Sequence, residues 1–258
     1  MSHWLISILS GVIVGFSLGL TGGGGSIFAV PLLVYVVRED IHLALGTSLA
    51  SVGAISLVGA VSRIYHRQAD LRTGAIFAAY GIVGTYAGTR LNAFVKGQAL
   101  LVLFALLMGF VAMNVWRRSQ GGQRGPSATD PLPRPQVLPL CLAGLGVGVA
   151  SGFFGIGGGF LIVPALLFFA RLDMHRAAST SLCVIAMNGL TGMVSYAVQH
   201  RPIDYPTTAA FIVGGIVGVR GGGWLAGRVS RGWLMKAFAV MVWGIALVLL
   251  VENVKKVF

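Results

Sequence analysis

Charged side chains are scarce in this chain: Asp, Glu, Lys and Arg supply 10% of its 258 residues, whereas hydrophobic residues supply 56%. A soluble domain of this size carries charge on about a quarter of its residues. The deficit excludes a surface that faces water throughout, and the mean hydropathy of +0.85 agrees with this. We therefore expect a protein whose outer surface faces lipid.

Acidic residues and cysteines are rarer still. The chain has 7 Asp and Glu against 19 Lys and Arg, a formal net charge of +12. The basic residues lie mostly between apolar stretches, as the positive-inside rule predicts for a membrane protein, so we expect no nucleic-acid partner. No Asp or Glu lies deep in an apolar stretch, which argues against a buried carboxylate proton relay. Cys141 and Cys183 lack metal-ligand spacing, so we expect no disulfide framework, no metal and no cofactor.

Ten apolar stretches predict an all-α polytopic membrane protein with about 8 to 10 membrane segments. Stretches of about 20 residues match the hydrocarbon core at the rise of an α-helix. A transmembrane barrel would alternate apolar and polar residues, and these stretches do not alternate. The stretches are 4–20, 26–37, 43–62, 73–89, 97–116, 137–154, 159–170, 177–198, 207–226 and 232–251.

The two halves of the chain are an internal duplication. Residues 15–50 align without gaps on residues 148–183 at an offset of 133, and 15 of the 36 positions are identical. One inserted residue then brings residues 81–88 onto 215–222. The shared skeleton contains Gly, Pro, Arg, Asp, His, Thr and Ser, so hydrophobic composition alone does not explain it. We expect membrane repeat 1 at residues 1–116, a linker at 117–136 and membrane repeat 2 at 137–258.

The distribution of basic residues predicts the orientation. If successive stretches alternate sides, twelve Lys and Arg residues fall on one side with the linker and six on the other, while Arg220 stays inside a stretch. The more basic side is the cytoplasmic one, so the linker is expected in the cytoplasm and the protein in the inner or plasma membrane. Five segments per unit then make the halves an inverted repeat, an arrangement typical of transporters.

Glycine clusters precede the two stretches that are too short to span a membrane, 26–37 and 159–170. Glycine allows the backbone to turn back at depth, and the half-helix that follows would direct its N-terminus toward the protein centre. A helix N-terminus presents free N–H groups to an anion, so we predict a substrate site here; close helix packing is the alternative. The predicted glycines are Gly22, Gly24, Gly25, Gly155, Gly157 and Gly158.

Paired hydroxyl residues follow each short stretch, at Thr47 with Ser48 and at Thr180 with Ser181. These hydroxyls either donate hydrogen bonds to the substrate anion or bond back to helix carbonyls. Arg220 is the charge inside a stretch; it either contacts the anion or extends to the interface. Small residues spaced four apart, as at Gly84 and Gly88, predict close helix contacts within the monomer, with a homodimer as the alternative.

The doubled glycine motif, followed by H-x-A-x-x-T-S-L at 42–49 and 175–182, resembles the sulfite exporter TauE/SafE family of membrane transporters. The resemblance covers nearly the whole chain and implies transport of small sulfur-containing anions such as sulfite or organosulfonates. The first copy carries Thr21 and Gly23 where the second carries Phe154 and Ile156, so the two half-sites are expected to contribute unequally.

These observations predict a secondary transporter or facilitator of a small anion. Other cargoes, such as a carboxylate, remain open, while a metal ion is disfavoured by the lack of acids and Cys/His pairs at depth. An intramembrane enzyme would need a catalytic constellation, and neither an HExxH motif nor a buried Asp pair is present. A membrane scaffold without transport is the remaining alternative.

Overall fold

The computed structural model describes residues 2–92, 94–95, 97–120, 137–155 and 159–257, and these residues form an all-helical bundle. The helices are α1 (Ser2–Thr21), α2 (Gly25–Pro31), the π-helical η1 (Leu32–Val37), α3 (Ile41–Tyr65), α4 (Leu71–Asn92), α5 (Gly97–Gln120), α6 (Val137–Phe154), α7 (Gly159–Phe169), α8 (Met174–Val198), α9 (Tyr205–Ala226) and α10 (Arg231–Val257). Each lies on one predicted apolar stretch, because only an uninterrupted helix satisfies its backbone polar groups in lipid. Helix α5 continues to Gln120, so the first four residues of the predicted linker are helical.

Five helices in the described part of the chain are long and apolar enough to cross a membrane: α1, α3, α6, α8 and α9. The combined α2–η1 segment and α7 are apolar but shorter, as the sequence predicted for the segments after the glycine clusters. The outer faces of the long helices carry large apolar side chains such as Leu9, Val61 and Leu142, each more than half exposed. Such an apolar exterior fits a lipid environment and confirms the polytopic all-α prediction.

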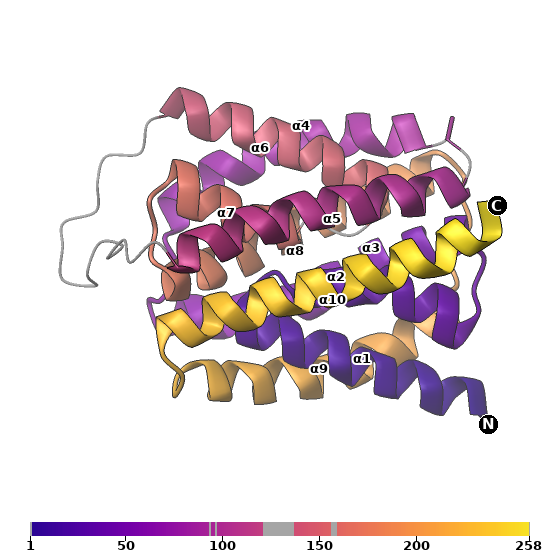
Figure 1. Cartoon of the computed structure of the whole chain (residues 1–258), viewed down its shortest axis with the longest axis horizontal. Coiled ribbons are helices and arrows are strands. Elements are labelled where there is room, and N and C mark those ends of the chain that lie inside the picture. The colour runs from indigo at the N-terminus through magenta and orange to yellow at the C-terminus, as the bar shows by residue number, and fades with distance from the viewer. Residues whose placement is uncertain (1, 93, 96, 121–136, 156–158, 258) are drawn as a thin grey trace.

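The helix pairs of the two halves correspond to one another. Helix α1 packs along α9 at one edge of the bundle, and α6 packs along α4 at the opposite edge (Figure 1). Both pairs are held by glycine contacts: a Cβ on Gly15 would lie 2.1 Å from the carbonyl oxygen of Gly215, and one on Gly148 would lie 2.3 Å from that of Gly81. Helices α3 and α8 cross at the centre, where Gly53 meets Gly189. The predicted packing of small residues within the monomer is thereby confirmed.

Matching aspartates cap the N-termini of equivalent helices, α3 and α8, in the two halves. Asp40 accepts a hydrogen bond from the backbone N–H of His42, and Asp173 accepts one from that of His175, so each carboxylate caps the helix that follows. Each preceding helix is followed within two residues by an arginine with positive φ, Arg38 at 66° and Arg171 at 53°. Asp40 and Asp173 therefore cap α3 and α8 in the same way.

Pro31 ends α2, and the following turn is π-helical. Proline has no N–H to donate to the carbonyl four residues earlier, so the hydrogen-bond register slips after it. The segment nevertheless continues in one direction through Val37. It leads back toward the end of the bundle where α1 begins, which is also the end where α10 terminates (Figure 1). We call this end the terminal face, and the end carrying Tyr65, Gln120 and Val137 the linker face.

Candidate functional site

The two glycine turns lie inside the bundle and contact each other through their flanks. Gly22 and Gly155 have φ values of 77° and 64°, a conformation that an L side chain rarely adopts. Gly23 lies against Gly159, since a Cβ on Gly23 would be 2.1 Å from the Gly159 carbonyl oxygen. The start of α7 and the turn before α2 thus meet, as predicted for segments that end at the protein centre. Gly157 and Gly158 lie outside the described residues.

Each glycine turn packs against the first turns of the central helix of the other half. A Cβ on Gly22 would lie 2.3 Å from the backbone of Ala178 in α8, and one on Gly155 would lie 2.5 Å from Leu45 in α3. Ala178 and Leu45 are equivalent in the duplication. The turns therefore need glycine for two reasons, backbone conformation and lack of space. Close packing is accordingly part of their role, whatever they also bind.

The hydroxyls of Thr180 and Ser181 are used to hold the architecture together. Ser181 Oγ lies 2.9 Å from the carbonyl oxygen of Gly22 and donates to it or to the carbonyl oxygen of Ala178. Thr180 Oγ1 accepts a 2.9 Å hydrogen bond from the backbone N–H of Asp70 at the start of α4. The predicted back-bonding alternative thus applies to Ser181, while Thr180 bonds to a different helix.

The equivalent hydroxyls of the first half are free of such bonds. Thr47 and Ser48 are fully buried, and neither hydroxyl has a hydrogen-bond partner among the described residues. A buried hydroxyl without a partner costs free energy, about 1–3 kcal/mol. Thr47 and Ser48 therefore differ from Thr180 and Ser181, their equivalents in the second half, in having unused hydrogen-bonding capacity.

The first glycine turn also carries its own internal cap. Thr21 Oγ1 accepts a 2.9 Å hydrogen bond from the N–H of Gly24 and donates to the carbonyl oxygen of Ser17. Phe154 occupies the equivalent position in the second half and offers no such bond. Gly25 packs directly on the α1 backbone: a Cβ on Gly25 would lie 2.2 Å from the carbonyl oxygen of Val14. One N–H at the start of α2 is thus satisfied by the protein itself.

Arg220 lies on the exposed face of α9, away from both glycine turns. Its neighbours on the same helix, Gly218 and Gly222, face α1 instead, where they contact the carbonyl oxygens of Val12 and Phe16. Side chains on opposite faces of a helix cannot serve the same site. The geometry therefore fits extension of Arg220 toward the interface.

Nothing in the sequence indicated that the carboxylate of Glu39 is buried. Both carboxylate oxygens are inaccessible and lack full hydrogen-bond geometry with any described residue. Burial, followed by the nearby Asp204 carboxylate, raises the pKa of Glu39 to about 7, and the neighbouring Thr47 and Thr207 hydroxyls oppose part of this rise. Leu172 occupies the equivalent place in the second half. An acid that titrates near neutral pH therefore lies at the edge of the bundle, next to a predicted site hydroxyl.

A half-buried arginine lies at each end of the bundle. At the linker face, Arg63 donates to the carbonyl oxygen of Gly19 over 3.0 Å and to Gln68 over 2.9 Å. At the terminal face, Arg201 donates to Asn92 over 2.7 Å. Within the described residues, neither guanidinium forms a salt bridge. Their positive charges are therefore available to attract an anion from either side.

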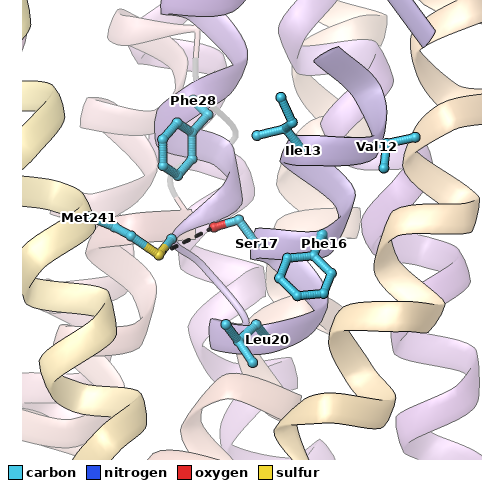
Figure 2. Close-up of a pocket in the computed structure, with 7 residues that line it drawn as sticks. All are labelled: Val12, Ile13, Phe16, Ser17, Leu20, Phe28 and Met241. Atoms are coloured by element: carbon cyan, nitrogen blue, oxygen red, sulfur yellow. Dashed lines mark hydrogen bonds between the residues drawn. The ribbon is translucent and has the colours of Figure 1, made fainter. Parts of the chain in front are cut away.

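An apolar groove of about 290 Å³ lies between α1, α2 and α10. Figure 2 shows its lining, in which Ser17 is the only hydroxyl residue and lies 3.9 Å from the sulfur of Met241. Ile13 and Phe16 on its rim are 49% and 39% exposed, so the groove opens on the outer face of the bundle. A groove with this lining suits an acyl chain and offers no charge for an anion.

Acidic side chains and unpartnered neutral polar groups are distributed differently in the described part of the bundle. Among the described residues, the acidic side chains between helices are Glu39, Asp40, Asp70, Asp173 and Asp204, and Glu252 lies near the chain end. No group of three His, Cys, Asp or Glu residues within the described ranges could hold a metal ion. The buried polar atoms that lack partners belong mainly to Ser, Thr, Asn and Tyr. Such neutral donors can replace water around a small anion.

Comparison with known proteins agrees with these features. The family model described as "Sulfite exporter TauE/SafE" matches residues 7–249. A "Probable membrane transporter protein" of Xylella fastidiosa (strain 9a5c) is 40% identical over 250 residues, 94% of this chain and 93% of its own. The "Probable membrane transporter protein YdhB" of Bacillus subtilis (strain 168) is 29% identical over 218 residues, 83% of this chain and 86% of its own. A further relative in Haemophilus influenzae is 30% identical over 210 residues, 76% of this chain and 74% of its own.

Proposed function

The chain belongs to the sulfite exporter TauE/SafE family of membrane transporters, and from this membership we propose that it moves a small sulfur oxyanion or organosulfonate, such as sulfite, across the cell membrane. Transporters are not enzymes, and the chain needs no reacting group for this task. Its work is to replace the water around the anion and to open alternately to the two sides.

One observation carries this proposal: the helices of the described bundle hold buried neutral donors without partners, while the acidic residues described, including the partly buried Glu39, lie between helices or near the chain end. Ser48, Thr85 and Asn188 are fully buried, and their side-chain polar atoms have no partner among the described residues. A carboxylate nearby would repel an anion, whereas hydroxyl and amide groups can donate hydrogen bonds to it. The interior is therefore suited to an oxyanion that has lost part of its water shell.

The proposed site lies where the two glycine turns adjoin α3 and α8. Gly22, Gly24, Gly25 and Gly155 would form its backbone walls, and Gly157 and Gly158, which the sequence also predicts for this site, lie outside the described residues. Thr47 and Ser48 supply hydroxyls that have no hydrogen-bond partner among the described residues, Ser181 bonds to the turn at Gly22, and Thr180 bonds to the start of α4. We leave Arg220 out of this site because its side chain lies on the outer face of α9.

The duplicated packing supports transport by alternating access. Helices α1 and α9 run parallel, as do α4 and α6, and each pair combines one helix from each half. We propose that the two halves are inverted across the membrane, with the linker in the cytoplasm and the inner or plasma membrane as location. The excess of basic residues on the linker side supports this orientation.

Uptake by proteoliposomes tests the proposal. Purified protein is reconstituted, and the entry of sulfite, thiosulfate, sulfate, taurine, sulfoacetate and acetate is followed with and without a pH or sodium gradient. Saturable uptake of a sulfur anion supports the assignment. Preferential uptake of acetate would instead indicate a carboxylate transporter. Absence of uptake of all these anions by folded protein would favour a membrane scaffold.

A further inference from the structure

Arg201 lies at the centre of a polar cluster at the terminal face. Its guanidinium donates to Asn92 Oδ1 over 2.7 Å and to the carbonyl oxygen of Thr89 over 3.4 Å, and it lies 3.3 Å from His42 Nδ1. Its Cζ lies 4.5 Å from the ring centroid of Tyr196. All of these partners lack a negative charge. Within the described ranges, no carboxylate forms a salt bridge with Arg201.

A row of polar side chains leads from this cluster toward the bundle centre. Helices α4 and α8 run parallel and share it: Thr89 Oγ1 lies 2.6 Å from Ser195 Oγ, and Thr85 lies one turn deeper on α4. Asn188 follows on α8, where its Oδ1 would be 2.9 Å from a Cβ on Gly81. Thr85, Thr89, Asn188 and Ser195 are all fully buried. We call Asn188, Thr85, Thr89, Ser195, Asn92 and Arg201 the α4–α8 polar row.

Two members of the row have side-chain atoms without partners. Thr85 Oγ1 bonds to no described residue, and the same holds for both polar atoms of the Asn188 amide. A buried amide that forms no hydrogen bond is costly and is rarely kept without a reason. The hydroxyl of the buried Tyr196, beneath Arg201, is also unpartnered. The row therefore holds unused hydrogen-bonding capacity from its deep end to its charged end.

The duplicated helix pair shows that packing does not require this row. Helices α3 and α9 form the equivalent contact in the other half, where Ile55 replaces Asn188 and packs on Gly215 as Asn188 packs on Gly81. The equivalents of Thr85, Thr89 and Asn92 are Val219, Gly223 and Ala226. Of the five row residues within α4 and α8, Ser195 alone keeps a polar equivalent, Ser62, and that residue is exposed. The same architecture thus forms with an almost apolar contact in one half.

We propose that the α4–α8 polar row is an anion-binding path, in which Arg201 captures a small oxyanion at the terminal face and Thr85 and Asn188 bind it on the way to the glycine turns. A planar guanidinium can hold an oxyanion through two parallel hydrogen bonds. Asn188 and Thr85 offer donors at the depth where water is excluded. The inference rests on the proposed transport of an anion and adds a route on one side of the site.

Sulfite uptake kinetics in proteoliposomes test the path, with thermal stability in detergent measured alongside. Arg201→Gln is expected to raise the KM for sulfite by about tenfold or more, because a charge-assisted contact to the anion is lost. The KM of Arg201→Lys should lie between the KM of the wild type and that of Arg201→Gln. The matched control is Arg90→Gln, which removes an equal charge near the same end of α4. The Arg90 side chain is exposed and bonds to Tyr86, so the KM of this variant should change by less than about twofold.

An unchanged KM in folded Arg201→Gln would overturn the path and leave Arg201 as a connector of α3, α4 and α8. If that variant does not fold, Thr85→Val carries the test, since the other half folds with Val219 at this place. Its thermal stability should be maintained and its uptake should fall by about fivefold or more; unchanged uptake would overturn the path. If the wild type takes up sulfite and these variants take it up equally well, this inference alone is contradicted. Absence of uptake by the wild type contradicts the proposed function and the path together.

Discussion

Ser181 lies with its hydroxyl oxygen 2.9 Å from the carbonyl oxygen of Gly22, although 159 residues separate the two in the chain. This contact joins α8 of the second half to the glycine turn of the first. Its duplicate would join Ser48 to the turn at Gly155, yet the Ser48 hydroxyl has no partner among the described residues. The glycine turn of the first half is thus held by the hydroxyl of Ser181, whereas the equivalent hydroxyl of Ser48 forms no such bond to the turn at Gly155.

This difference predicts opposite outcomes for two alanine variants. Ser181→Ala should lower the free energy of unfolding by about 1 kcal/mol, because a buried hydrogen bond is lost. Ser48→Ala should leave stability almost unchanged and weaken anion uptake instead. Thermal unfolding in detergent and uptake by proteoliposomes measure the two effects separately. Equal changes in stability and uptake in the two variants would show that Ser48 and Ser181 have the same role in the two halves.

Gly22 is expected to tolerate no side chain. Its φ of 77° and the 2.3 Å approach of a built Cβ to Ala178 both oppose alanine, so Gly22→Ala should destabilise the protein by at least about 2 kcal/mol. Gly109→Ala serves as control, since nothing lies within 4 Å of its Cβ position and alanine favours the helix. Expression level and thermal unfolding of both variants are the measurements. A stable Gly22→Ala protein would contradict the turn geometry.

Glu39 should make stability depend on pH. Because burial raises its pKa to about 7, the folded protein holds this proton more tightly than the unfolded chain, and the stabilisation is present at low pH and lost as the pH rises through about 7. The Tm of the wild type should therefore fall between about pH 5 and pH 8, and Glu39→Gln should flatten this slope. Asp40→Asn, which removes an exposed neighbouring charge and can still cap α3, should keep the wild-type slope. Identical slopes in wild type and Glu39→Gln would show that Glu39 does not titrate there.

Asn188→Ile should separate stability from function. The equivalent residue Ile55 packs in the same manner, and the change removes two unpartnered buried polar atoms, so we expect a gain of about 1 kcal/mol in stability together with loss of uptake. Thr191→Val, nearby on α8, is the control because its hydroxyl only bonds back to the Met187 carbonyl oxygen. Thermal unfolding and uptake are compared for the two variants. Retained uptake in Asn188→Ile would exclude the amide from the transport route.

Much of the fold follows from local sequence. Apolar stretches gave the helix bounds within a few residues, since lipid leaves the backbone no other option, and the duplication indicated which helices correspond. The turns at Gly22 and Gly155 were also predictable, because a run of glycines before a short apolar stretch has few other uses. Aspartates placed two residues before a histidine indicated the caps at Asp40 and Asp173.

Features that depend on contacts between distant segments could not be predicted in the same way. The bond from Asp70 to Thr180 and the burial of Glu39 arise only when helices from the two halves pack together. Asn188 lies in a predicted apolar stretch, but the sequence did not show which helix faces its amide. Arg201 looked like one more basic residue in a connection, and only the arrangement of α4 and α8 reveals the polar row that it terminates.

Exchange of radiolabelled sulfite tests the central claim most directly. Proteoliposomes loaded with unlabelled sulfite are diluted into a trace of labelled sulfite, and the label inside is followed for wild type, Asn188→Ile and protein-free vesicles. We expect transient accumulation by the wild type only, because exchange needs a site that binds sulfite and reorients without any added gradient. Label that enters all three preparations equally, with the protein shown to be folded, would contradict sulfite transport by this chain.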